Sequence, residues 1–94
     1  MLPLYRDHRT ERFAHGEQVP AFQAIERPAE RRLQFLLNAA SLADIGAISG
    51  YRLEPLKGHR TGQWSIRIND QWRICLKWDG ATKSPSNIEI VDYH

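Results

Sequence analysis

The stretch from residue 64 to residue 78 constrains the fold most, because apolar and polar side chains alternate along it with a period of two. This alternation is typical of β-strands that bury one face and leave the other polar. It predicts two strands, at residues 64–68 and 72–78, with a tight connection around Asn69 and Asp70. The chain is therefore expected to build its core on an antiparallel sheet.

The length of that connection decides which side chains share a face. A two-residue loop pairs Ile66 with Arg73, which mixes apolar and charged side chains on both faces. A three-residue connection at residues 69–71, or a bulge, pairs Ile66 with Ile74 and Arg67 with Arg73. We favour the second register because it keeps one face apolar.

A helix is expected before the strands, at residues 28–40. Leu33, Leu36 and Leu37 recur at the i, i+3, i+4 spacing of one helix face, and Pro28 fits the first helical position. The other expected elements are a short helix at residues 7–15, a helical turn after Ser41, an edge strand at residues 2–5 and a last strand at about 88–93.

These elements predict one α+β domain at residues 1–94, with N-terminal helices packed on one face of a twisted, mainly antiparallel sheet. Leu33, Leu36 and Leu37 are expected to cover the apolar strand face, where each large side chain that is fully buried contributes about 1.5–3 kcal/mol. That face consists of Trp64, Ile66, Ile74 and Leu76, and the core is expected to include Trp72 and Trp78.

The composition is that of an ordinary globular protein, with 41% hydrophobic and 26% charged residues. A single cysteine, Cys75, excludes an internal disulfide and a cysteine-based zinc cluster, and the histidines have no ligand spacing, so we expect no metal or other cofactor. No apolar run approaches the roughly 18–20 residues of a membrane helix, and no secretion signal is recognisable. These features indicate a cytoplasmic protein without a membrane partner.

Positive charge is concentrated on the strands. Residues 52–77 hold six Lys or Arg and two carboxylates, a net charge of +4, against +2 for the whole chain. The polar strand face therefore suits an anionic ligand, and RNA is the ligand we consider. The cations expected to bind RNA are Lys57, Arg60, Arg67 and Lys77.

Metal-independent RNA cleavage needs groups of the kinds found here, because the 2′-OH of RNA is an internal nucleophile. A guanidinium such as that of Arg73 binds a phosphate bidentately and stays charged. The segment at residues 92–94 adds acid–base groups: His94 titrates near neutrality, Tyr93 donates or stacks on a base, and Asp92 orients a neighbour.

Each of these residues also has an ordinary structural interpretation. Arg73 suits a surface ion pair, Tyr93 suits edge packing, and His94 suits a frayed chain end. Glu54 is more often a salt-bridge partner, here of Arg52 or Arg73, than a base. Only the joint pattern favours the catalytic interpretation.

Four segments together make the chain resemble the HigB-type toxins of type II toxin–antitoxin systems, in the RelE/ParE superfamily. They are residues 52–58 (RLEPLKG), 62–67 (GQWSIR), 69–74 (NDQWRI) and 89–94 (EIVDYH). The resemblance is good over residues 28–94 and covers the first 27 residues only in outline. It implies a small RelE-like, microbial-ribonuclease-type fold, with helices on a mostly antiparallel sheet.

The resemblance also implies a toxin that cuts mRNA in the ribosomal A site and thereby inhibits translation and growth. The implied partners are the ribosome, mRNA, a helix-turn-helix HigA-type antitoxin, and promoter DNA through the toxin–antitoxin complex. Arg73 corresponds to the arginine that holds the scissile phosphate, residues 92–94 to the acid–base cluster, and Lys57 to a lysine on the RNA side. Glu54 stands where many relatives carry histidine; it is a candidate base, although it repels phosphate.

Two alternatives stay open at this point. The chain is a toxin of the same fold that binds another target, such as a topoisomerase, or it is a weakened toxin that serves mainly as a co-regulator with its antitoxin. Glu54 keeps the second alternative open.

Overall fold

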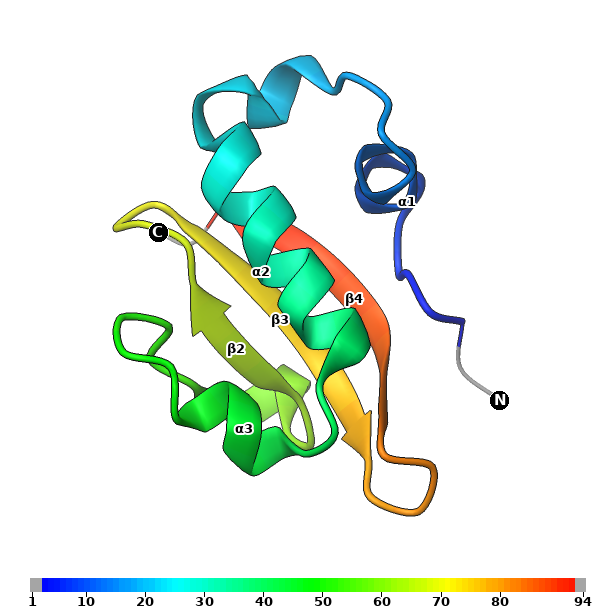
Figure 1. Ribbon diagram of the computed structural model, residues 1–94, viewed down its shortest axis with the longest axis vertical. Helices are drawn as coiled ribbons and strands as arrows, with labels where there is room; N and C mark the ends of the chain where they lie inside the picture. Colours follow the sequence, from blue (N-terminus) through cyan, green and yellow to red (C-terminus); the bar gives the residue numbers. More distant parts are fainter. Residues whose placement is uncertain (1–2, 93–94) are drawn as a thin grey trace.

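The computed structural model describes residues 3–92, and in it the helices pack on one face of an antiparallel sheet (Figure 1). The sheet has four strands in the order β1-β2-β3-β4, so each strand pairs with the next along the chain. The predicted α+β class is therefore confirmed. The elements are α1 (His8–Ala14), the 3₁₀ helix η1 (Pro20–Ile25), α2 (Glu26–Asn38), α3 (Leu42–Gly46), β1 (Glu54–Pro55), the 3₁₀ helix η2 (Gly58–Arg60), β2 (Trp64–Arg67), β3 (Trp72–Asp79) and β4 (Ser84–Asp92).

The favoured register of β2 and β3 is confirmed. Ile66 lies opposite Ile74, and Arg67 lies opposite Arg73. The side-chain oxygen of Asn69 accepts hydrogen bonds from the backbone N–H groups of Gln71 and Trp72, at 2.9 and 2.8 Å. An Asn side chain that bonds the following backbone in this way stabilises a turn, which explains the three-residue connection.

The last strand begins earlier than predicted, at Ser84 instead of residue 88. Proline disfavours strands because it has no N–H donor, but Pro85 lies opposite Trp78 near the end of the sheet, where the loss of a donor matters less. A shift of register between Cys75 and Lys77 accommodates the extra length of β4. The expected edge strand at residues 2–5 is represented, within the described residues, by a single parallel bridge between Tyr5 and Ile88.

Helix α2 covers the apolar sheet face with Ala29, Leu33 and Leu36, which are at most 3% exposed. The prediction for Leu37 was wrong, because 40% of its surface is exposed. Leu37 is turned roughly 100° around the helix from Leu36, so it falls at the border of the buried face. The helix also begins two residues before Pro28, because it continues directly from η1.

The N-terminal helices have the ends that their sequences favour. Asp7 caps α1 by accepting the backbone N–H of Thr10, and Ser41 caps α3 in the same way. The buried hydroxyl of Thr10 accepts a hydrogen bond from the backbone N–H of Ile90 at 3.1 Å, which fixes α1 against β4. The three tryptophans, which were expected in the core, are half-buried at its border.

Candidate functional site

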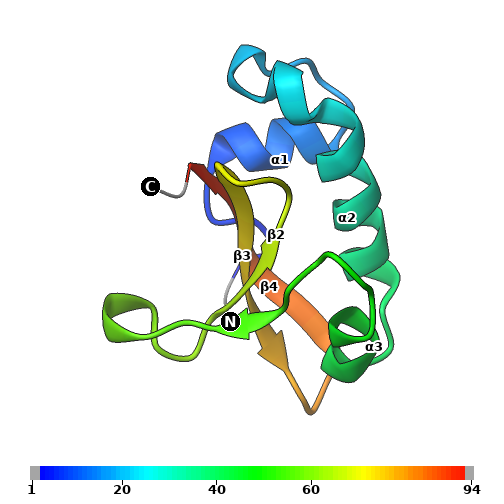
Figure 2. The same ribbon diagram turned by 90° about the vertical axis from the view of Figure 1, so that its left-hand side faces the viewer.

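The sheet face opposite the helices is the open face, and it carries most of the predicted site residues. The loop at residues 56–63 projects on this side of the sheet, whereas α2 and α3 lie on the other side (Figure 2). Strand pairing places two rows of side chains on the open face, because residues opposite one another share a face. One row is Glu54, Ser65, Cys75 and Glu89, and the next is Arg67, Arg73 and Val91.

Two arginines lie directly opposite one another in the second row. Like charges in this position destabilise a sheet, so the Arg67–Arg73 pair is a local conflict of the kind expected at functional sites. Asp70, in the turn between the strands, forms an ion pair with Arg67. The hydrogen bond and charge of Arg67 lower the pKa of Asp70, and Arg52 and Arg73 lower it further. A carboxylate is thus already held by this cationic cluster, which shows that the cluster favours an anion.

The guanidinium of Arg73 is partly enclosed, since its Nε and Nη1 atoms have almost no contact with solvent. Val91 is the residue opposite Arg73 on β4, and Asp92 follows it. The side-chain amide of Gln71 donates a hydrogen bond to Asp92 at 3.1 Å. The fold therefore brings Arg73 and Asp92 to one end of the sheet. Two further predicted residues, Tyr93 and His94, lie outside the described residues.

Arg60, predicted to bind RNA, is held by the protein itself. Its guanidinium donates to the side-chain oxygen of Gln63 and to the carboxylate of Glu89, both at 3.1 Å. Arg6 lies 3.5 Å from the same carboxylate oxygen. These contacts tie the loop at residues 56–63 to β4, and they leave Arg60 better suited to positioning that loop than to binding a phosphate alone.

Cys75 and Ser65 lie beneath this network and are at most 2% exposed. Cys75 is therefore not accessible from the open face. Burial raises the pKa of the Cys75 thiol, and this effect outweighs the opposing effect of Arg60. The thiol is protonated near neutral pH and is a poor nucleophile.

The remaining predicted site residues are Glu54, Lys57 and Lys77. Glu54 is exposed on β1 and forms no ion pair with any residue between 3 and 92, so its interpretation as a salt-bridge partner was wrong. Lys57 is exposed in the loop. Lys77 is half-buried and borders an open hollow of about 750 Å³ that Leu4 and Gly62 also line.

Sequence reasoning missed three polar side chains that hold this face together. They are Asp70, which binds Arg67, Gln71, which binds Asp92, and Glu89, which binds Arg60. Only Glu89 left a signal in the sequence, because it alternates with Ile88 and Ile90 and so had to face away from the core.

Residues 3–92 contain no cluster of three or more His, Cys, Asp or Glu side chains arranged to hold a metal ion. Over the same residues, no helix has the length and apolar character needed to cross a membrane. His8, His15 and His59 are exposed.

Two solved structures share this fold over nearly the whole chain. A YoeB/ParE toxin from Agrobacterium tumefaciens gives a TM-score of 0.58 at 17% identity, covering 100% of this chain and 99% of that one. A chain of the YoeB–YefM complex from Staphylococcus aureus gives a TM-score of 0.56 at 21% identity, covering 96% and 92%. The predicted RelE-like fold is therefore confirmed.

Relatives at higher identity define the family. The protein named Endoribonuclease HigB from Proteus vulgaris is 37% identical over 76 residues, which are 81% of this chain and 77% of that protein. Toxin HigB-1 from Vibrio cholerae serotype O1 is 32% identical over 82 residues, which are 82% and 84% of the two chains. Residues 4–94 match the HigB-like toxin family, described as the RelE-like toxin of the type II toxin–antitoxin system HigB. The chain belongs to this family.

Proposed function

We propose that this toxin is an endoribonuclease that cuts mRNA on the ribosome and so stops translation and growth. The observation that carries the proposal is the pair of opposed arginines, Arg67 and Arg73, on the open face at the end of the sheet where Asp92 also lies. A relative that is named an endoribonuclease supports RNA as the substrate. The cationic open face is suited to a phosphodiester backbone.

In the proposed reaction, the 2′-OH of the RNA attacks the adjacent phosphorus. The P–O5′ bond breaks, and the products are a 2′,3′-cyclic phosphate and a 5′-hydroxyl. Arg73 binds the non-bridging oxygens and stabilises the added negative charge of the phosphorane, a role for which one donor contributes about 3–4 kcal/mol. The protein needs no metal for this step, because Arg73 supplies the positive charge.

The two proton transfers are assigned to the acid–base residues predicted from the sequence. A base removes the 2′-OH proton and an acid gives one to the leaving 5′-oxygen, and each such group contributes about 10²–10⁴-fold. His94 is proposed for proton transfer and Tyr93 for donation or stacking on a base. Asp92, hydrogen-bonded to Gln71, orients its neighbours. Glu54 is the candidate for a second base.

The RNA strand is proposed to run along the open face. Lys57, Arg67 and Lys77 bind its phosphates, and the hollow beside Lys77 extends the path beyond the cleavage point. Arg60 contributes indirectly, since its bonds to Gln63 and Glu89 hold the loop that carries Lys57.

The proposed protein partner is a HigA-type antitoxin with a helix-turn-helix domain. A solved complex of the same fold, YoeB with YefM, supports a direct toxin–antitoxin contact. Binding of the antitoxin stabilises the toxin by mass action. The two proteins together are proposed to bind promoter DNA, where the antitoxin reads the bases.

Mapping of mRNA 5′ ends in cells tests the proposed function. Induction of the wild type is expected to arrest growth and to create new 5′ ends inside translated regions. Arg73→Ala is expected to remove both effects, whereas Arg31→Ala, at an exposed arginine on the helical side, retains them. Growth arrest with intact transcripts would instead support a toxin that acts on another target.

A weakened toxin is the second candidate, and Glu54 is the observation that favours it. The Glu54 side chain is exposed on the open face, where its charge repels RNA phosphates. Glu54→His removes this charge and supplies an imidazole. A large increase in cleavage by the variant would support the weakened-toxin interpretation, and an unchanged or lower rate would refute it.

A further inference from the structure

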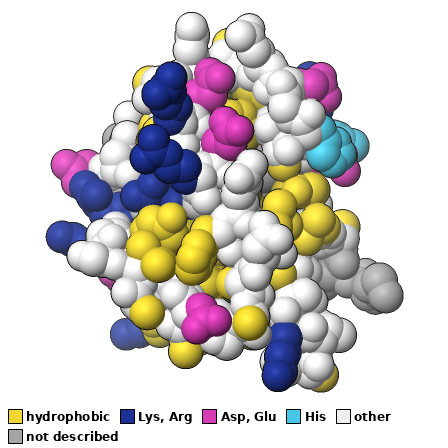
Figure 3. Space-filling model, viewed as in Figure 1, with side chains coloured by type: hydrophobic (Ala, Val, Ile, Leu, Met, Phe, Trp, Pro, Cys, Tyr) yellow, Lys and Arg dark blue, Asp and Glu magenta, His cyan; other side chains and the backbone are white. Residues whose placement is uncertain are grey.

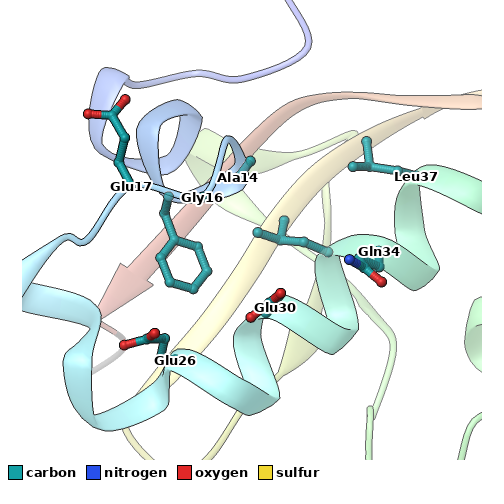
Figure 4. Close-up of a pocket in the computed structure, with 9 residues that line it drawn as sticks. Ala14, Gly16, Glu17, Glu26, Glu30, Gln34 and Leu37 are labelled. Carbon is teal, nitrogen blue, oxygen red and sulfur yellow. The ribbon is translucent and has the colours of Figure 1, made fainter.

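A groove between α1 and α2, on the side of the molecule away from the proposed cleavage site, has no role in the function described so far (Figure 4). Its apolar lining includes Phe13 and Ala14 from α1, and Leu33 and Leu37 from α2. The volume is about 180 Å³, which is below the roughly 300–1,000 Å³ of typical small-molecule sites. The groove therefore suits one anchoring side chain of a protein segment better than a whole small ligand.

The rim of this groove is acidic. Glu17 follows α1, and Glu26 and Glu30 project from α2 (Figure 4). Glu26 and Glu30 are four residues apart on one helix face, so their like charges mildly destabilise α2. Among residues 3–92, none of the three glutamates has an ion-pair partner. Their charge is therefore available to a partner outside the chain.

Leu37 extends the apolar surface from the groove toward solvent. Its 40% exposure makes it one of two large exposed hydrophobic side chains in the described part of the chain, and the other is Leu4. Hydrophobic and acidic side chains lie next to one another on this face of the molecule (Figure 3). Arg27 and Arg31 line a second depression of α2 together with Glu30 and Gln34, so these arginines lie near Glu30. Neither arginine lines the groove itself, where Glu17 and Glu26 also carry negative charge.

We propose that the groove docks a cationic segment of the antitoxin, which inserts one large apolar side chain between α1 and α2 and places Lys or Arg beside the glutamates. Charge complementarity selects this occupant, because an acidic rim repels nucleic acid and attracts a basic peptide. An amphipathic helix that lays an apolar anchor into a groove is a common mode of peptide recognition. The inference depends on the proposed function for the existence of the antitoxin.

Binding of matched variants tests the inference. The probe is the helix-turn-helix protein encoded beside the gene for this chain, purified separately. Leu37→Gln and the double variant Glu26→Gln/Glu30→Gln are each expected to weaken binding by about tenfold or more. Leu4→Gln, at an equally exposed leucine on the other side, is expected to bind like the wild type. The loss in the double variant should shrink at high salt, because the interaction is electrostatic.

A photo-crosslinking residue at position 37, with position 4 as the control, identifies the bound segment. The inference predicts a crosslink from position 37 to an antitoxin peptide that contains Lys or Arg. It is overturned if the variants bind like the wild type, if the crosslinked peptide is acidic, or if the crosslink joins two copies of this chain. RNA cleavage by Leu37→Gln and by the double glutamate variant, which should be unchanged, is the separate readout of the proposed function. A wild type that cuts RNA but binds no antitoxin would overturn this inference alone and leave the cleavage proposal standing.

Discussion

The open face of the sheet holds two opposed arginines, Arg67 and Arg73, whereas the groove on the helical side is bordered by three glutamates. Both arrangements set like charges close together, which costs stability in each region. On the open face, Asp70 offsets part of the repulsion by binding Arg67. Around the groove, no residue in the 3–92 range offsets it by an ion pair.

This difference explains how one small domain can bind two ligands of opposite charge. The open face favours a polyanion and the groove favours a cationic protein segment. The core lies between them, so a ligand on one side need not displace a ligand on the other. Like charges that the fold places close together thus indicate the charge of the ligand that each region binds.

The largest expected effect comes from the core that the two regions share. Leu36 is fully buried, and Leu36→Ala is expected to lower the free energy of unfolding by about 2–5 kcal/mol. Its neighbour Leu37 is the matched control, because Leu37→Ala removes a side chain that is 40% exposed. Thermal unfolding measures both. Equal losses for the two variants would contradict the orientation of α2.

Substitution of Arg73 is expected to reduce RNA cleavage on the open face and to leave antitoxin binding at the groove unchanged. Arg73→Ala should reduce RNA cleavage by about 10²–10³-fold, the usual loss for one transition-state donor. Arg73→Lys keeps the charge without the bidentate geometry, so its activity should fall between those of Arg73→Ala and the wild type. Cleavage assays on ribosome-bound mRNA and antitoxin titrations measure the two functions. An equal loss of antitoxin binding would show that the regions are not independent.

A smaller effect is expected at the ion pair between Arg60 and Glu89. Their side chains are 31% and 20% exposed, and a double-mutant cycle with Arg60→Ala and Glu89→Gln should give a coupling of about 0.5–1 kcal/mol in stability. RNA affinity should fall in both single variants, because each releases the loop that carries Lys57. A variant Glu89→Gln that binds RNA more tightly would indicate that Arg60 is a phosphate ligand after all.

The smallest effect is expected from Asp70→Asn. Because Arg67 lowers the pKa of Asp70 in the folded protein, this carboxylate stabilises the fold above its unfolded pKa of about 4. That contribution disappears as the pH falls through the lowered value. Acid unfolding curves of the wild type and the variant should therefore converge at low pH. A difference between them that grows as the pH falls would contradict the assignment.

In the wild type, Asp70 competes with an RNA phosphate for Arg67, and the same variant removes this competitor. The plot of log affinity against log salt concentration should become steeper by up to about 0.7, the value for one complete phosphate contact to a single strand. An unchanged slope would show that Arg67 does not reach the RNA.

Much of the fold could be predicted from the sequence, because the relevant signals are local. The period of two fixed the β2–β3 register through Ile66 and Ile74, and the leucine spacing located α2. The exposure of Leu37 could not be predicted in the same way. It depends on the rotation of the helix over the sheet, which is set by packing with η1 and the strands rather than by the helix sequence.

The site was predicted less completely. Strand alternation placed Arg67 and Arg73 on one face, and that placement is confirmed. The engagement of Arg60 with Glu89 joins residues that are 29 positions apart, and no local pattern encodes such a contact. The catalytic assignments of Tyr93 and His94 stay predictions, since both lie outside the described residues.

The most direct test of the central claim uses ribosome-bound mRNA with a single 2′-deoxynucleotide at the mapped cleavage position. If the open face around Arg73 promotes attack by the 2′-OH, the wild type will cut the all-ribose mRNA, leave a 2′,3′-cyclic phosphate, and fail to cut the substituted position. Equal cleavage of both mRNAs at that position would contradict the account.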